Sequence, residues 1–207
     1  KVKNGGVKKI SPKIFPLLSH SMPYAPQCLT FSSKSVTIVL EVEMNAKQKY
    51  IKLYKEMADL CEAEGWGDPF SYARSKEIYA ACVLGHDIAP TLSGADAYNE
   101  KGEPVEYKST INKKIKGSYT GISVQSTWEK QERYLREEKL ANYPEHFYNR
   151  FENGKLVESW KLTGDKVFNI LLPKLKKKYA TILTKKDPRL SADITNKDIK
   201  NNGTQII

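Results

Sequence analysis

The sequence predicts an α/β or α+β fold in which helices flank a mixed β-sheet. Three observations support this class. Apolar residues recur at helical spacing in several segments, short apolar segments bounded by turn residues lie between them, and no internal repeat is present. The chain of 207 residues is long enough for one full domain, or for one domain and an arm.

Residues 1–43 differ in composition from the rest of the chain. They contain six Lys, no Asp and four of the ten prolines, and their apolar residues show no clear period. This composition is typical of a basic arm that is extended or disordered, although residues 35–43 could form one strand. We therefore expect an arm over 1–43 and a single domain over 44–207, which opens with a well-patterned helix.

Two helices are expected at the start of this domain. Apolar residues follow helical spacing from Asn45 to Gly65, which ends the pattern. Asp68 is a typical N-cap and Pro69 suits a first helical position, so a second helix is expected from there to Gly85. The apolar residues of the first helix are Tyr50, Leu53, Tyr54, Met57, Leu60 and Cys61.

The middle of the chain predicts short strands. Residues 94–98 and 104–111 are apolar enough to pair as strands, and the polar residues 99–103 between them predict a hairpin loop. A further strand is expected over 119–124. A third helix is expected over 126–142, where apolar and charged residues recur at helical spacing.

The last part of the chain predicts a hairpin and a helix. Residues 146–151 and 155–163 alternate as strands do, and Asn153-Gly154 between them is a strong hairpin signal. A fourth helix is expected over 165–183, kinked or restarted at Pro173. The last twenty or so residues are polar, and we expect them to be weakly structured.

Charge and cysteine usage limit the possible functions. A net charge of +10 favours a polyanionic partner, nucleic acid first, although basic charge also serves solubility. The three cysteines have no paired spacing, which indicates neither a zinc site nor a disulfide framework and favours an intracellular, cytoplasmic protein. Cys61 and Cys82 are expected in the core. No apolar run reaches membrane-spanning length, so no membrane partner is expected.

The first expected hairpin carries a cluster of charged residues. Alternate residues of a strand share a face, so Glu106 and Lys108 should point the same way, and Asp96 on the preceding strand should meet Glu106. Carboxylates on neighbouring strands offer the oxygen ligands that Mg²⁺ prefers, and a lysine can stabilise negative charge at phosphorus. Burying three charges is costly unless a site requires them, which favours a functional site over a solvated ion pair.

This pattern resembles the motif of the PD-(D/E)xK nuclease superfamily, with Ala95 in place of the proline before Asp96 and with Glu106 and Lys108 as the E-x-K pair. The resemblance implies a restriction-endonuclease-like core in which Asp96, Glu106 and Lys108 are catalytic. It also implies that Asp96 and Glu106 bind Mg²⁺, joined by Glu77 from the preceding helix.

The same resemblance implies a function. We expect a Mg²⁺-dependent deoxyribonuclease, and within that class a Type II restriction endonuclease that cuts double-stranded DNA as a homodimer and leaves 5′-phosphates. Such an enzyme would have a companion DNA methyltransferase. Two alternatives stay open: a repair or recombination nuclease of the same superfamily, and a non-catalytic basic DNA-binding module.

Other residues are candidates for DNA contacts. Lys113, Lys114 and Lys116 follow the motif strand and could hold phosphates, although a solvated loop explains them equally well. Gln125 follows the strand over 119–124, where a surface position is an equal alternative. Arg150 lies on the second hairpin, which could present it to bases in the major groove.

Overall fold

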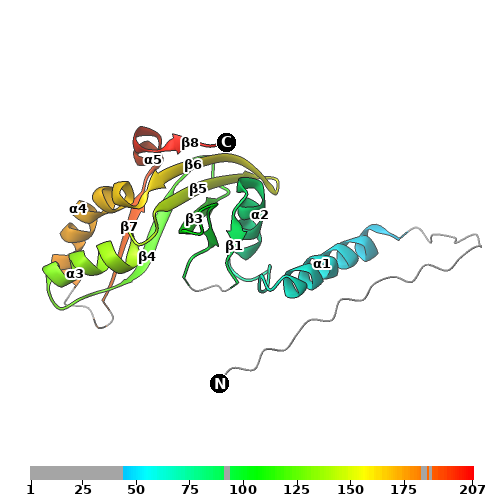
Figure 1. Ribbon diagram of the computed structural model, residues 1–207, viewed down its shortest axis with the longest axis horizontal. Coiled ribbons are helices and arrows are strands. Elements are labelled where there is room, and N and C mark those ends of the chain that lie inside the picture. Colours follow the sequence, from blue (N-terminus) through cyan, green and yellow to red (C-terminus); the bar gives the residue numbers. More distant parts are fainter. Residues whose placement is uncertain (1–43, 91–93, 183–185, 187) are drawn as a thin grey trace, which may run out of the picture. The chain divides into compact units, whose positions relative to one another are not determined.

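The computed structural model describes residues 44–90, 94–182, 186 and 188–207 (Figure 1). The expected arm over 1–43 and its candidate strand lie outside the described residues. The described residues belong to one unit, Met44–Ile207. Among them, no helix is both long and apolar enough to cross a membrane.

A mixed six-stranded β-sheet runs through this unit, in the order β1-β2-β3-β5-β6-β8. Only β3 and β5 pair in parallel, with Glu106 opposite His146 and Lys108 opposite Tyr148, and the other neighbours are antiparallel. The strands are β1 (Asp87–Ile88), β2 (Ala97–Tyr98), β3 (Pro104–Thr110), β5 (Glu145–Glu152), β6 (Lys155–Thr163) and β8 (Thr204–Gln205). The predicted α+β class with a mixed sheet is confirmed.

A second, two-stranded sheet pairs β4 (Gly117–Ser123) with β7 (Arg189–Ile194). The ladder is irregular between Tyr119 and Ile122, where Gly121 has a φ of +66°. Such a bulge bends a strand and re-aims its side chains. The strand expected over 119–124 is confirmed, with its start two residues earlier.

Five α-helices complete the described residues: α1 (Ala46–Ala63), α2 (Arg74–Leu84), α3 (Trp128–Tyr134), α4 (Gly164–Ile182) and α5 (Asn196–Asn202). The first and fourth expected helices are confirmed, and α4 continues through Pro173. The third ends in a π-helical turn, Leu135–Lys139. The second begins later than predicted, because Asp68 accepts hydrogen bonds from Phe70 and Ser71 and so closes a turn before the helix.

Two sequence predictions were wrong. The last twenty residues are not weakly structured: they form β7, α5 and β8, and a reciprocal capping box between Thr195 and Asp198 starts α5. Cys82 is exposed rather than in the core, whereas Cys61 is buried as expected. The buried side of α2 instead carries Arg74, Ile78 and two alanines.

The large sheet is packed on both faces. On one face, α2 contributes Ala80 and Ala81 to a core that also contains Val105, Tyr107 and Phe147. On the other face, β4, β7 and α4 pack against Tyr148 and Leu162. Alternate residues of β3 therefore face different cores, and Glu106 and Lys108 lie on the side of β4.

Candidate active site

The β2–β3 hairpin positions Asp96 beside Glu106. Side-chain and backbone hydrogen bonds of Asn99 close the five-residue loop, and the ladder then pairs Ala97 with Val105. Asp96 lies immediately before β2 rather than on it. Its backbone N–H donates to the carbonyl of Val105 (3.1 Å), and its carboxylate accepts the backbone N–H of Tyr107 (2.6 Å). These bonds hold the Asp96 carboxylate at the edge of β3, next to Glu106.

Glu106 and Lys108 share a face of β3, as the sequence predicts. The Lys108 ammonium contacts the Glu106 carboxylate, and the side chains are 24% and 17% exposed. The Lys108 Nζ also lies 5.2 Å from the centre of the Tyr119 ring. Both side chains therefore remain accessible from solvent.

These two residues line a polar cleft of about 270 Å³. Its other wall carries Ser118, Thr120 and Tyr119 from β4, and its rim carries Lys139 and Tyr143 after α3. Gly117 allows the walls to approach, because a Cβ there would come within 2.3 Å of the Tyr148 ring.

The helix α2 brings Glu77 to the same region. Glu77 lies one turn from fully buried Arg74, whose Nη1 is 3.4 Å from the Glu77 carboxylate. Arg74 also donates from Nε to the carbonyl of Trp66 (2.8 Å) and contacts the carbonyl of Ala89. The sequence analysis missed Arg74, and its i, i+3 spacing to Glu77 was the available signal.

The carboxylates influence one another electrostatically. Burial, and then the negative charges of Glu106 and Glu77, together raise the pKa of Asp96 to about 7. The hydrogen bond from Tyr107 and the charge of Lys108 oppose this shift only in part. The pKa of the Tyr143 hydroxyl is also raised, by burial and then by Glu106 and Asp96. Asp96 is therefore the point at which the negative charges of Glu106 and Glu77 act together, and of the three carboxylates Glu106 lines the cleft.

The donor chemistry of this group suits Mg²⁺, because all three side chains offer carboxylate oxygens. However, among the described residues no three His, Cys, Asp or Glu side chains converge tightly enough to form a ready metal cage. Each carboxylate is held by a protein donor instead: Glu106 by Lys108, Glu77 by Arg74, and Asp96 by the N–H of Tyr107. The residues fit the ion in chemistry, and these donors compete with it.

A buried polar chain supports the floor of the cleft. The Nε2 of His146 bonds to the carbonyl of Leu140 (2.8 Å), so Nε2 carries the proton and Nδ1 accepts from the Tyr119 hydroxyl (2.9 Å). Tyr148 then donates to Tyr119 (2.8 Å). Burial lowers the pKa of His146 to about 4, which keeps the ring neutral. The sequence analysis gave His146 no role, because its partners lie on other elements.

The candidates for DNA contact lie outside this group. Lys113, Lys114 and Lys116 are exposed on the loop between β3 and β4, and the last two border a separate hollow beside α5. The backbone N–H of Gln125 donates to the buried Gln131 side chain (2.8 Å). Arg150 is held by Glu158 (2.8 Å) and by Glu152. None of the five lines the cleft.

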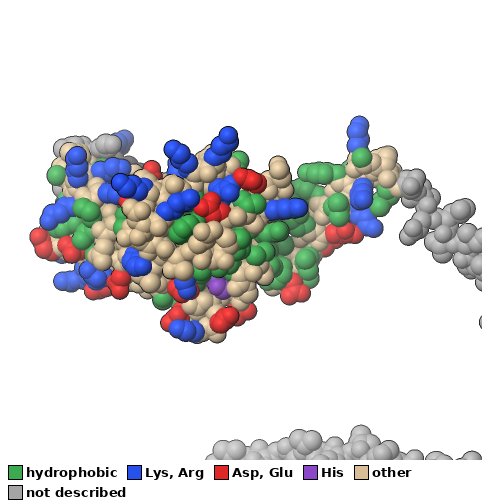
Figure 2. Space-filling model, turned by 90° about the horizontal axis from the view of Figure 1, so that it is seen from above, with side chains coloured by type: hydrophobic (Ala, Val, Ile, Leu, Met, Phe, Trp, Pro, Cys, Tyr) green, Lys and Arg blue, Asp and Glu red, His purple; other side chains and the backbone are tan. Residues whose placement is uncertain are grey.

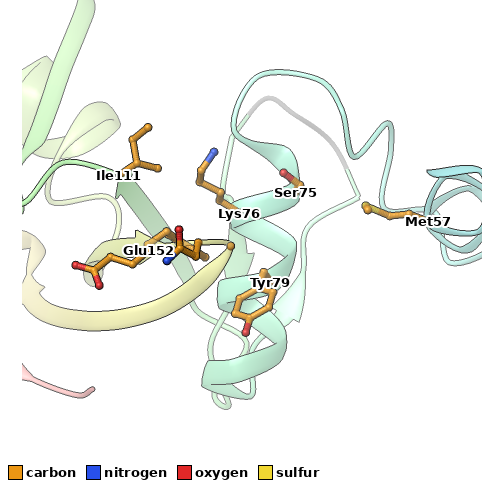
Figure 3. Close-up of a pocket in the computed structure, with 9 residues that line it drawn as sticks. Met57, Ser75, Lys76, Tyr79, Ile111 and Glu152 are labelled. Carbon is orange, nitrogen blue, oxygen red and sulfur yellow. The ribbon is translucent and has the colours of Figure 1, made fainter. Parts of the chain in front are cut away.

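Basic side chains are nevertheless prominent on the surface. Figure 2 shows Lys and Arg side chains spread over the drawn face, with fewer acidic ones between them. A hollow of about 670 Å³, larger than the cleft, lies beside α2 and shares no lining residue with the cleft (Figure 3). Met57, Ser75, Lys76, Tyr79, Ile111 and Glu152 line it. The volume of a hollow alone therefore does not identify the candidate active site. The smaller cleft is the better candidate because Glu106 and Lys108 line it.

The fold and the cleft define an α+β protein with a charged site on an inner strand of a mixed sheet. No protein-family model matches the sequence, and the comparison with curated proteins gives no match. The function must be argued from the residues themselves.

Proposed function

We propose that this chain is a Mg²⁺-dependent deoxyribonuclease of the PD-(D/E)xK type. One observation carries the proposal: the Asp96 carboxylate is held by the Tyr107 N–H directly beside the Glu106–Lys108 pair, which lines the cleft. Burial and the negative charges of Glu106 and Glu77 raise the pKa of Asp96 to about 7, and such repulsion between carboxylates favours a site that receives a cation. A merely structural hairpin has no need of this charge.

The order of elements also supports the proposal. The helix α2 comes first, the β2–β3 hairpin that carries the motif follows, and β5 then pairs in parallel with β3. We expect this arrangement of a restriction-endonuclease-like core. The parallel pairing of β3 with β5 buries the inner side of the motif strand, so that its charged residues emerge only at the cleft.

The chemistry follows from the positions of the side chains. Asp96 and Glu106 would hold Mg²⁺, with Glu77 as a further ligand, and the ion would supply positive charge at the phosphate. Lys108 lies where it can stabilise the charge that develops at phosphorus or orient water. Hydrolysis with in-line displacement would leave a 5′-phosphate. Lys139, exposed at the rim of the cleft, can position the DNA backbone.

Within this class we propose a Type II restriction endonuclease that acts in the cytoplasm on double-stranded DNA as a homodimer, with a companion methyltransferase. A two-fold protein would read a two-fold site. The basic charge of +10 supports a DNA substrate.

The test is incubation of the full chain with supercoiled plasmid, with and without Mg²⁺. Discrete fragments that require Mg²⁺ are expected. A smear or trimmed ends would indicate a repair-type nuclease instead. Intact plasmid in a protein that retards DNA would contradict catalysis and favour a binding module.

A matched pair of variants ties the activity to the cleft. Glu106→Gln should abolish cutting, whereas Glu100→Gln removes the same charge from the exposed loop of the same hairpin and should not. Equal activity of the two variants would contradict the assignment of the site.

A further inference from the structure

The helix α1 exposes a continuous apolar stripe. Among its eighteen residues, all of which the structure describes, only Cys61 is buried. The stripe consists of Tyr50, Leu53, Tyr54, Met57 and Leu60, which are 42–69% exposed. Their spacing of three and four residues places them on one face, about 15 Å long.

The contrast with α4 shows that the exposure is unusual. The two helices have similar lengths and similar apolar spacing, but α4 buries Val167, Phe168, Leu171, Leu175 and Tyr179. A soluble helix with such a face ordinarily buries it against a partner. Among the described residues, Tyr54 stacks on Phe70 (ring centres 3.7 Å apart) and Met57 lines the hollow beside α2, but no described element covers the stripe as a whole.

The charges of α1 indicate what that partner is. The first half, 46–55, carries four Lys and no acid, and the second half with its cap, 56–64, carries four acids and no base. Figure 2 shows this order, with Lys at the far end of α1 and acidic side chains nearer the rest of the unit. The helix dipole favours acidic residues in the first turn and basic residues in the last, by about 0.3–1 kcal/mol per charge. The charges of α1 have the opposite order. Stability of the isolated helix therefore does not explain it.

We propose that α1 pairs antiparallel with α1 of a second copy of this chain. A two-fold axis across the stripe places the basic half of each helix along the acidic half of the other and buries both stripes. The two helix dipoles then also oppose each other favourably. The inference names the surface of a homodimer, but it rests on the exposure and charge of α1 and not on nuclease activity.

Other occupants fit the charges less well. An anionic lipid surface would attract the basic half but repel the four acids of the second half. A basic or an acidic partner would match one half only. A second copy matches both halves with a single helix.

The test measures mass in solution, with charge-reversed variants of the full chain. The parent should sediment at twice its 23.5 kDa at micromolar concentration. Two variants change all four charges of one half: the all-acidic variant is Lys47→Glu/Lys49→Glu/Lys52→Glu/Lys55→Glu, and the all-basic variant is Glu56→Lys/Asp59→Lys/Glu62→Lys/Glu64→Lys. Each should sediment as a monomer. An equimolar mixture of the two should recover the doubled mass, because opposite halves again carry opposite charge.

Controls separate this interface from folding and from other surfaces. Lys130→Glu/Lys177→Glu reverses two exposed charges on α3 and α4 and should stay dimeric. Circular dichroism should show unchanged folding in all variants. A monomeric parent, two dimeric charge variants, or a mixture that stays monomeric would each overturn the proposal. A parent that dimerises only after residues 1–43 are removed would also overturn it, because that segment would then cover α1.

Discussion

Two charged groups involve strands of the large sheet, and they differ in charge balance. In the first, Arg150 on β5 donates from Nε to Glu158 on β6 (2.8 Å) and also contacts Glu152. Trp160 donates to the same Glu158 carboxylate (2.8 Å). Although burial opposes it, these hydrogen bonds from Arg150 and Trp160 lower the pKa of Glu158. The Lys200 ammonium also lies 3.7 Å from the Glu158 carboxylate, so two cations face two carboxylates and this group is neutralised.

The second group is the carboxylate cluster of Asp96, Glu106 and Glu77, which is not neutralised. Glu106 pairs with Lys108 and Glu77 with Arg74, whereas no cation among the described residues pairs with Asp96, and its carboxyl has a pKa of about 7. The comparison teaches that charge alone does not mark a functional site on this sheet. An imbalance that costs stability, and that a ligand could correct, is the better indicator.

The largest expected effect separates the two groups by activity. Glu106→Gln removes a carboxylate from the cleft and should reduce plasmid cleavage by at least about a thousandfold, the scale of losing one group that stabilises transition-state charge. Asp96→Ala and Lys108→Ala should do the same. Cleavage rates at saturating Mg²⁺ measure the effect, with circular dichroism to verify folding.

The control is the same chemical change in the balanced group. Glu158→Gln should retain cleavage within about threefold, because this carboxylate pairs with Arg150, Trp160 and Lys200 and lies outside the cleft. If Glu158→Gln were as inactive as Glu106→Gln, the contrast between the groups would have no functional meaning.

Stability should change in opposite directions in the two groups. The folded-state pKa of Asp96, about 7, lies above the ordinary value of 3.8, so its contribution to the free energy of unfolding is fully present below pH 3.8 and is lost as pH rises to 7. Asp96→Asn should therefore stabilise the protein increasingly over this range, by up to roughly 4 kcal/mol above pH 7. Urea unfolding at pH 5 and pH 8 measures the gain.

Glu158→Gln should behave in the reverse way. The pKa of Glu158 is lowered, so its stabilisation is present at neutral pH and disappears in acid. Loss of the Glu158 carboxylate should lower the free energy of unfolding by about 1–2 kcal/mol at pH 8 and by less at pH 4. Destabilisation by Asp96→Asn at pH 8 would contradict the account of the carboxylate cluster as a site of excess charge.

Added Mg²⁺ should stabilise the parent protein at pH 8 without any DNA. A ligand at a hundred times its dissociation constant contributes about 2.7 kcal/mol to the folded state. On addition of Mg²⁺, the midpoint temperature of thermal unfolding should rise in the parent and in Glu158→Gln. It should rise much less in Asp96→Asn and Glu106→Gln. An equal rise in all four proteins would place the binding outside the cleft.

The sequence predicts those parts of the site that local rules determine. The loop of the β2–β3 hairpin depends on Asn99 and its own neighbours, and the Asn153–Gly154 turn on two residues with positive φ, 49° and 78°. The alternation of side chains along β3 then places Glu106 and Lys108 on the same face of the sheet. These features require no knowledge of distant contacts.

The remaining features depend on distant pairing, which local patterns do not contain. His146 meets Tyr119 only because β3 pairs with β5, and β7 finds β4 about seventy positions earlier in the chain. The position of Glu77 also depends on contacts that local patterns do not contain. The helical spacing places Glu77 at the edge of a face that carries Ile78 and Cys82, but Cys82 is exposed. Buried Arg74 holds the Glu77 carboxylate instead.

The smallest expected effect concerns Glu77, which joins the unbalanced group through its charge. Glu77→Gln removes one of the two anions that raise the pKa of Asp96, and it leaves an amide oxygen that can still accept from Arg74. We expect weaker Mg²⁺ binding with a nearly unchanged maximal rate. The Mg²⁺ concentration for half-maximal cleavage should rise about three- to tenfold, the scale of about 1 kcal/mol. Glu138→Gln, on the exposed π-helical turn, is the matched control and should titrate like the parent. Glu106→Gln should not recover at any Mg²⁺ concentration, because it removes a ligand of the core group itself. A titration in which Glu77→Gln overlays the parent would exclude Glu77 from the site, and the imbalance would then rest on Asp96 and Glu106 alone.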